Sequence, residues 1–240
     1  MELLSKGLLG IHIAAGFLSI VLFWIPVLVK KGSTIHNKVG KAYVYAMWVV
    51  VITAVFLSIE NFIQGQVEMA IFLGFLSFIT ANPIWYGIAI LKYKKNIPPH
   101  LKRNHIAFNL MITLMGGMLL AYGIYLGQNG ILMIIFGILG LSTGKDVYMS
   151  YKNKSNESNW LKEHITGMLT SAIAAYTAFF VFGGMNFMRH IFTGYLVIIP
   201  WTMPGVVGGI LMNYYLKSYT KKTSVAVSYT HLTLPTICSV

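Results

Sequence analysis

Long runs of uncharged, apolar residues occupy most of this chain, and they restrict the folds that it can adopt. Most of these runs approach the ~20 residues that an α-helix needs to cross the hydrocarbon core of a bilayer. Inside a bilayer the backbone must satisfy its own hydrogen bonds, which favours helices. The runs lie at 8–29, 42–63, 67–91, 106–126, 131–143, 164–182 and 190–214. The sequence therefore predicts an all-α, polytopic transmembrane bundle of about seven helices.

The composition of the chain supports this prediction and argues against a nucleic-acid-binding protein and a disulfide-rich protein. Of the 240 residues, 56% are hydrophobic and only 10% are charged, whereas about 25% of residues are charged in soluble domains. The net charge of +12 does not indicate a nucleic-acid partner, because the basic residues lie in short segments between apolar runs. The single cysteine, Cys238, excludes a disulfide framework within the chain.

The distribution of basic residues predicts the orientation of the bundle, because cytoplasmic loops carry the excess of lysine and arginine. Of the 18 basic residues, only Lys6 and Arg189 fall on one side under the seven-helix count. The other side holds Lys30, Lys31, Lys38, Lys41, Lys92, Lys94, Lys95, Lys102, Arg103, Lys145, Lys152, Lys154, Lys162, Lys217, Lys221 and Lys222. We therefore expect a multi-pass protein of the cell (plasma) membrane, with its N-terminus outside and its C-terminus in the cytoplasm.

The fifth apolar run is the weakest of the seven, because its uncharged stretch is short before Lys145 and Asp146. Six helices with one re-entrant segment are the alternative count. The chain is expected to be one transmembrane domain over residues 1–222, followed by a non-native or disordered tail over 223–240. The last fourteen residues read VSYTHLTLPTICSV, and the first ten of them resemble a translated sequencing adapter. On this interpretation His231 and Cys238 have no function.

Histidines near the ends of the apolar runs are the candidate cofactor ligands. We expect His12 and His190 toward the outside, and His36, His105 and His164 toward the cytoplasm. Imidazoles from different helices can ligate haem iron, so the leading hypothesis is a redox protein with haem b and an electron-transfer or quinone partner. His12 and His190 would form an outer pair, and two of the three inner histidines an inner pair.

Two other interpretations of these histidines remain open. The three inner residues could bind zinc with an open fourth position, as in a metal-dependent membrane hydrolase. Alternatively, a histidine at a helix end needs no ligand, because its ring is solvated in the headgroup region. His105 stands out because Asn109 and Thr113 follow it at four-residue spacing, which predicts a polar stripe facing the bundle.

Prolines within the apolar runs predict breaks in the helical hydrogen bonding. Pro83, Pro200 and Pro204 lack the amide hydrogen that an uninterrupted helix uses, so they free carbonyl groups inside the membrane. They predict kinks, and also a substrate cavity lined by Thr80, Asn82, Asn109 and Thr202. This cavity supports the alternative function, a small-molecule or lipid transporter or binding bundle without a cofactor. Because the deep parts of the runs contain no charged residue, cation-coupled transport is disfavoured.

Pairs of glycines in the apolar runs indicate where helices pack closely, because small residues allow close backbone approach in lipid. The candidates are Gly116 with Gly117, Gly123 with Gly127, and Gly205 with Gly209. Ordinary helix packing accounts for such pairs, so they do not identify a dimer.

The first quarter of the chain carries two motifs. His12 begins an HxxxG pattern, and the residues from Lys31 to Met47 read KGSTIHNKVGKAYVYAM, which follows KGSxxHxxxGxxYxxxM. Together these motifs resemble the opening of an uncharacterised family of predicted bacterial multi-pass membrane proteins, and the segment Arg103–His105 is similar to a later block of that family. The resemblance implies a polytopic bacterial inner-membrane protein with His12, His36 and His105 at motif positions. It implies no activity.

Overall fold

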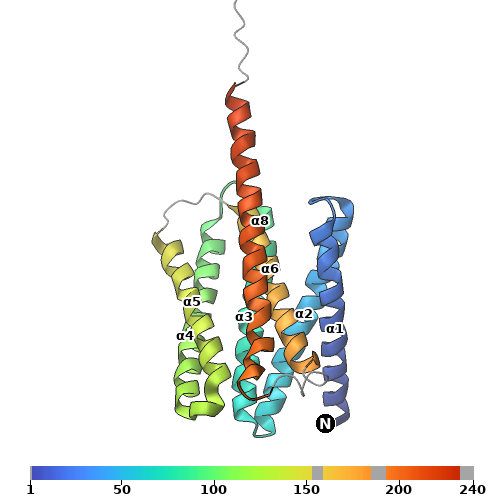
Figure 1. Ribbon diagram of the computed structural model, residues 1–240, viewed down its shortest axis with the longest axis vertical. Coiled ribbons are helices and arrows are strands. Elements are labelled where there is room, and N and C mark those ends of the chain that lie inside the picture. The colour runs from blue at the N-terminus through green and yellow to red at the C-terminus, as the bar shows by residue number, and fades with distance from the viewer. Residues whose placement is uncertain (1, 153–158, 185–192, 233–240) are drawn as a thin grey trace, which may run out of the picture.

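The protein is a bundle of helices in this computed structural model, which describes residues 2–152, 159–184 and 193–232 (Figure 1). The long helices are α1 (Glu2–Leu28), α2 (Thr34–Ile63), α3 (Val67–Ala89), α4 (Pro99–Leu126), α5 (Ile131–Lys152), α6 (Trp160–Ala178) and α8 (Ile198–Leu232). Short 3₁₀ turns span Ile90–Lys92, Gly127–Gly130 and Gly194–Val197, and a π-helical turn spans Phe179–Gly184. The predicted all-α fold is confirmed for the described residues.

Several helices have the length and apolar character that a membrane span requires. In the described part of the chain, five helical stretches meet this requirement: Ser5–Leu28, Thr34–Ile63, Val67–Lys92, Pro99–Lys152 and Trp160–Gly183. The fourth stretch contains both α4 and α5. Many apolar side chains face outward from the bundle, which suits contact with lipid. The seven-helix count and the orientation stay predictions, and the beginning of the last expected span lies outside the described residues.

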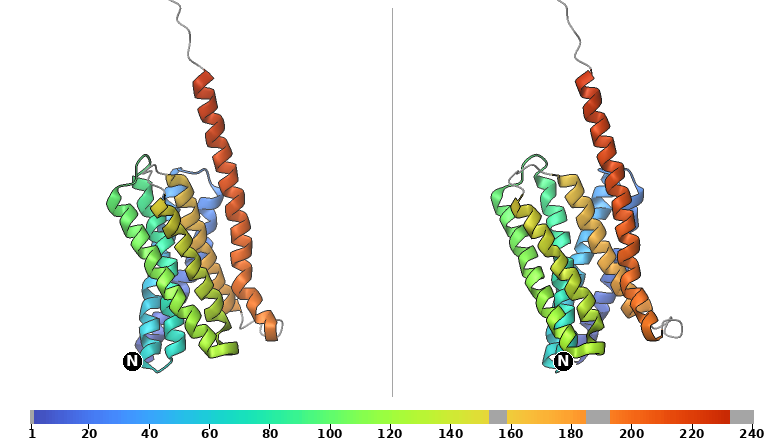
Figure 2. Two further views of the ribbon diagram at one scale, coloured as in Figure 1. Left: turned by 90° about the vertical axis from the view of Figure 1, so that its left-hand side faces the viewer. Right: turned by 60° about the vertical axis from the view of Figure 1, so that its left-hand side comes forward.

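The loops that carry basic residues meet at one end of the bundle. Figures 1 and 2 show that α1, α3 and α5 end there and that α2, α4 and α6 begin there. The N-terminal start of α1 lies at the opposite end. We call the end at which α2, α4 and α6 begin the basic end. It includes Lys30, Lys31, Lys38, Lys94, Lys95, Lys102 and Arg103. Helix α8 also runs toward this end, passes beyond the bundle and continues to Leu232.

Glycines let α4 and α5 pack closely as an antiparallel hairpin. A Cβ atom added to Gly116 would lie 2.8 Å from Cα of Gly140, and one added to Gly137 would lie 2.6 Å from the backbone nitrogen of Leu120. The prediction of close packing is confirmed for Gly116 and Gly123, whose neighbours are backbone atoms of α5 or of the turn before it. It is wrong for Gly127, Gly205 and Gly209, which face open space. For Gly127 a positive φ of 61° explains the choice of glycine.

Helix α3 lies between the two halves of the core. One cluster of buried side chains joins it to α2 and α6 and includes Met47, Ile84 and Leu169. A second cluster joins it to α4 and α5 and includes Phe75 and Ile112. Because α3 contributes to both clusters, it sets the relative positions of the polar side chains described below.

Helices α3 and α6 cross where two glycines meet. A Cβ atom on Gly167 would lie 2.5 Å from the backbone oxygen of Pro83 and 2.9 Å from Cα of Gly87. No residue larger than glycine fits at this crossing without a shift of one helix. The crossing therefore brings the start of α6 against the end of α3.

Candidate functional site: a histidine pair and a buried polar chain

His36 and His164 lie at the basic end, near the starts of α2 and α6. Nδ1 of His36 is 3.1 Å from the backbone oxygen of Pro26, in the last turn of α1. Nδ1 of His164 is 2.8 Å from the backbone oxygen of Gly87, in the last turn of α3. The last four carbonyls of a helix lack intrahelical partners, so each histidine satisfies an acceptor at the end of a neighbouring helix.

These hydrogen bonds determine the tautomer of both rings. A carbonyl oxygen only accepts, so in each neutral ring Nδ1 carries the hydrogen and Nε2 keeps its lone pair. Nε2 is the atom that is available to a metal in both residues. His36 and His164 also lie close enough to interact electrostatically.

The two histidines occupy equivalent positions on helices that run in the same direction. Both α2 and α6 begin at the basic end (Figure 1). Seven residues after His36 is Tyr43, and seven residues after His164 is Ser171; the hydroxyls of these two residues lie 2.7 Å apart. Seven residues are about two helical turns, so the two histidines lie at about the same level of the bundle. Tyr43 and Ser171 were not among the predicted site residues.

Lys31 also contributes to the end of α1 beside His36. Its Nζ donates hydrogen bonds to the backbone oxygens of Pro26 and Val27, at 2.7 and 2.5 Å. Partial burial lowers the pKa of Lys31. A cation near the C-terminus of a helix interacts favourably with the helix dipole, so Lys31 and His36 together stabilise this end of α1.

His105 differs from the other two inner histidines. Its Nε2 accepts a hydrogen bond from Nδ2 of Asn109 at 3.0 Å. Its ring stacks on Tyr86 of α3, with the ring centroids 3.5 Å apart and the planes 2° from parallel. His36 and His164 therefore resemble each other more than either resembles His105, and the predicted inner pair, any two of the three, stays a prediction.

Asn82 and Asn109 extend a polar chain from His105 into the bundle. Nδ2 of Asn82 donates to Oδ1 of Asn109 at 2.6 Å, and their side chains are 7% and 3% exposed. Oδ1 of Asn82 is buried and has no hydrogen-bond partner. Asn82 and Asn109, two of the four predicted cavity residues, are thus hydrogen-bonded to each other. Of the others, Thr80 is half-buried on α3, and Thr202 donates to the backbone of its own helix at Ile198.

Two threonines link this chain to α5. The hydroxyl of Thr113 donates to the backbone oxygen of Asn109 at 2.8 Å and lies 2.9 Å from the hydroxyl of Thr143. The polar stripe that was predicted along α4 is therefore present over His105, Asn109 and Thr113. Asn82 and Thr143 connect it to the helices on either side.

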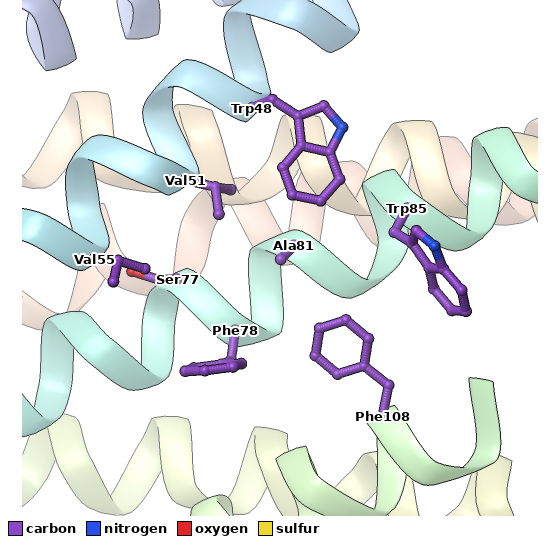
Figure 3. A pocket seen from close by; sticks show the side chains of 8 residues that line it. All are labelled: Trp48, Val51, Val55, Ser77, Phe78, Ala81, Trp85 and Phe108. Atoms are coloured by element: carbon purple, nitrogen blue, oxygen red, sulfur yellow. The ribbon is translucent and has the colours of Figure 1, made fainter. Parts of the chain in front are cut away.

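A groove of about 210 Å³ lies between the helices of the bundle (Figure 3). It is apolar except for one serine, and its walls come from α2, α3 and α4. The lining residues are Trp48, Val51, Val55, Ser77, Phe78, Ala81, Trp85 and Phe108. Trp48 and Trp85 were not among the predicted site residues, because a groove between three helices leaves no pattern within any one of them.

His12 lies farther from the basic end, on α1. Its Nδ1 is 2.8 Å from the hydroxyl of Thr53, which itself donates to the backbone oxygen of Val49. Since the hydroxyl hydrogen is used, Nδ1 of His12 is the donor and its Nε2 keeps the lone pair. His190, the expected partner of His12, lies outside the described residues, so the outer pair stays a prediction.

Within residues 2–152, 159–184 and 193–232, no three side chains of histidine, cysteine, aspartate or glutamate form a group that could hold a metal ion. The chain matches no known family model, no curated protein and no solved structure.

Proposed function

We propose that this chain is a membrane-embedded redox protein that binds haem b through His36 and His164 at the basic end. One observation carries the proposal: both rings donate from Nδ1 to a main-chain carbonyl and keep Nε2 available, on two helices that begin at the same end of the bundle. Histidines that ligate metals almost always donate their other ring N–H to a carbonyl, a carboxylate or water. Imidazole nitrogens can hold haem iron, so His36 and His164 would hold the group through Nε2.

The residues around the two histidines have defined tasks under this proposal. The backbone oxygens of Pro26 and Gly87 fix the ring orientation and the tautomer, and they make the imidazoles more basic. Both oxygens belong to helix C-termini, whose partial negative charge adds to this effect. The Tyr43–Ser171 hydrogen bond keeps α2 and α6 in register, so that both histidines stay at the same level. Bound haem would supply one-electron transfer.

An absorption spectrum of the purified protein tests the proposal. The protein should be expressed with a supply of haem and purified in detergent. We expect a Soret band with the spectrum of bis-histidine haem. His36→Ala and His164→Ala should each abolish this spectrum, and His105→Ala should leave it in place, because Nε2 of His105 is occupied by Asn109.

His100→Ala is the matched control, because His100 is an exposed histidine at the same end of the bundle. Its spectrum should equal that of the parent protein. Absence of a Soret band in the parent protein overturns the proposal. An unchanged spectrum in both His36→Ala and His164→Ala also overturns it, since these histidines would then only cap the C-termini of α1 and α3.

A further inference from the structure

We propose that the connection between α3 and α4 is a binding surface for an anionic phospholipid. Its basic side chains receive the headgroup phosphate, and the acyl chains lie along the outer face of α4. This surface is at the basic end but contains neither His36 nor His164, so it is independent of the haem proposal. Three features support it: the density of cations, the apolar cluster beneath them, and an exposed face of α4 that continues from a cation into apolar residues.

Basic side chains are concentrated where α3 passes into α4. Of the 18 lysines and arginines of the chain, five lie in the segment 92–103, which contains no aspartate or glutamate. They are Lys92, Lys94, Lys95, Lys102 and Arg103. Lysines on α5 and α6 differ, because Asp146 interacts electrostatically with both Lys145 and Lys162. Clusters of basic residues beside a membrane span attract the headgroups of anionic lipids. The segment 92–103, which we call the basic segment, therefore has the charge that such a headgroup requires.

An apolar cluster holds the basic segment against the bundle. Ile90, just before the segment, and Leu101, within it, are buried together with Tyr86. Trp160, at the start of α6, packs on this cluster, and Nζ of Lys94 lies 5.1 Å from the centroid of its ring. Tryptophan is enriched at the headgroup level of membrane proteins. The exposed Lys94 is therefore held at the level where the phosphates of lipids lie.

The outer face of α4 continues from the basic segment into apolar residues. Residues at spacings of four, three and four share this face, and all are exposed: Arg103, Ala107, Leu110 and Leu114. A guanidinium can bind two oxygens of a phosphate at once, so Arg103 suits the headgroup. Leu110 and Leu114 are 47% and 57% exposed and lie in a membrane-length apolar stretch, where acyl chains can cover them. This face favours a phospholipid over a small soluble anion, which would use the cations alone.

Native mass spectrometry of the purified full chain in detergent tests this surface, because it counts the lipid molecules that remain bound. The probes are dioleoyl phosphatidylglycerol, which is anionic, and dioleoyl phosphatidylcholine, which has the same acyl chains and a zwitterionic headgroup. Each lipid is titrated separately. We expect the first phosphatidylglycerol to bind about tenfold more tightly than phosphatidylcholine. Glycerol 3-phosphate at the same concentration should not displace it, because this soluble anion lacks acyl chains.

Two exposed cations of the surface can be neutralised without disturbing the core. Lys94→Gln and Arg103→Gln should each reduce the preference for phosphatidylglycerol about threefold, and the double variant should bring the two affinities to within about twofold of each other. Lys145→Gln is the matched control, because Lys145 is an exposed lysine near the same end of the bundle and interacts with Asp146. It should keep the preference of the parent protein. His36→Ala should keep it as well, which separates this test from the haem proposal.

Equal affinities of the parent protein for the two lipids would overturn the proposal. A preference that survives in the double variant, or that falls as far in Lys145→Gln, would also overturn it, because charge elsewhere at the basic end would then attract the lipid. Displacement of phosphatidylglycerol by an equal concentration of glycerol 3-phosphate would overturn it too, since the surface would then be a site for small soluble anions.

Discussion

The hydroxyls of Tyr43 and Ser171 lie 2.7 Å apart and join α2 to α6, two helical turns from the histidine pair. Ser171 also lies 2.9 Å from the backbone oxygen of Met168, to which its hydroxyl donates. Because a hydroxyl has one hydrogen, Tyr43 must be the donor between the two side chains. Tyr43 is 3% exposed and Ser171 is fully buried, so water cannot replace either partner.

Ser171→Ala should destabilise the protein more than Tyr43→Phe does. Ser171→Ala leaves the phenolic O–H of Tyr43 buried without an acceptor, which costs about 1–3 kcal/mol. Tyr43→Phe removes that donor, and Ser171 keeps its bond to Met168, so the cost is about 0.5–1.5 kcal/mol. Unfolding monitored by tryptophan fluorescence in detergent measures the difference. Ser142→Ala, at an exposed serine of α5, is the control. Equal losses in the two core variants would contradict the donor assignment.

The helices could be predicted from the sequence because each apolar run carries its own evidence. Length and the absence of charge place a helix without any knowledge of its neighbours. The same holds for the stripe from His105 to Thr113, whose spacing lies within a single helix. Asn82 and Asn109 could be singled out as buried amides for a similar reason, since polar residues within an apolar run are rare.

Contacts between helices could not be predicted in the same way. Gly116 was expected to pack closely, but its partner is Gly140 of α5, which no spacing within α4 reveals. The carbonyls that hold His36 and His164 depend on where α1 and α3 end. One signal was available in the sequence: Tyr43 and Ser171 follow the two histidines at the same seven-residue distance.

Asn109→Leu should cost more stability than Asn82→Leu. Asn109 bonds to both Asn82 and His105, so its loss leaves the amide of Asn82 and Nε2 of His105 unpaired. Asn82→Leu leaves only Oδ1 of Asn109 unpaired and also removes an oxygen that already lacks a partner. We expect a difference of about 1–3 kcal/mol in the free energy of unfolding. Thermal unfolding in detergent checks this order. The reverse order would contradict the hydrogen bonds that connect Asn82, Asn109 and His105.

Gly116→Ala should destabilise the α4–α5 hairpin, and Gly117→Ala should not. A Cβ atom at Gly116 would meet backbone atoms of Gly140 and Leu141 at 2.8–2.9 Å, where nothing can move aside easily. At Gly117 the nearest atom is Cδ2 of Leu141 at 3.6 Å, which is ordinary contact. Overpacking costs about 1–3 kcal/mol, whereas alanine in a helix gains about 0.5–1 kcal/mol over glycine. The melting temperatures of the two neighbouring variants should therefore move in opposite directions.

Gly167→Ala should disturb both stability and the position of His164. The added methyl group would lie 2.5 Å from the backbone oxygen of Pro83, so α6 must move away from α3. That movement lengthens the 2.8 Å bond between His164 and Gly87 and frees the ring. We expect a loss of about 1–3 kcal/mol and, if His164 ligates haem, a weakened bis-histidine spectrum. Gly209→Ala is the control, because nothing lies within 4 Å of a Cβ atom there. A parent-like melting temperature in Gly167→Ala would contradict the close crossing of α3 and α6, whatever the spectrum shows.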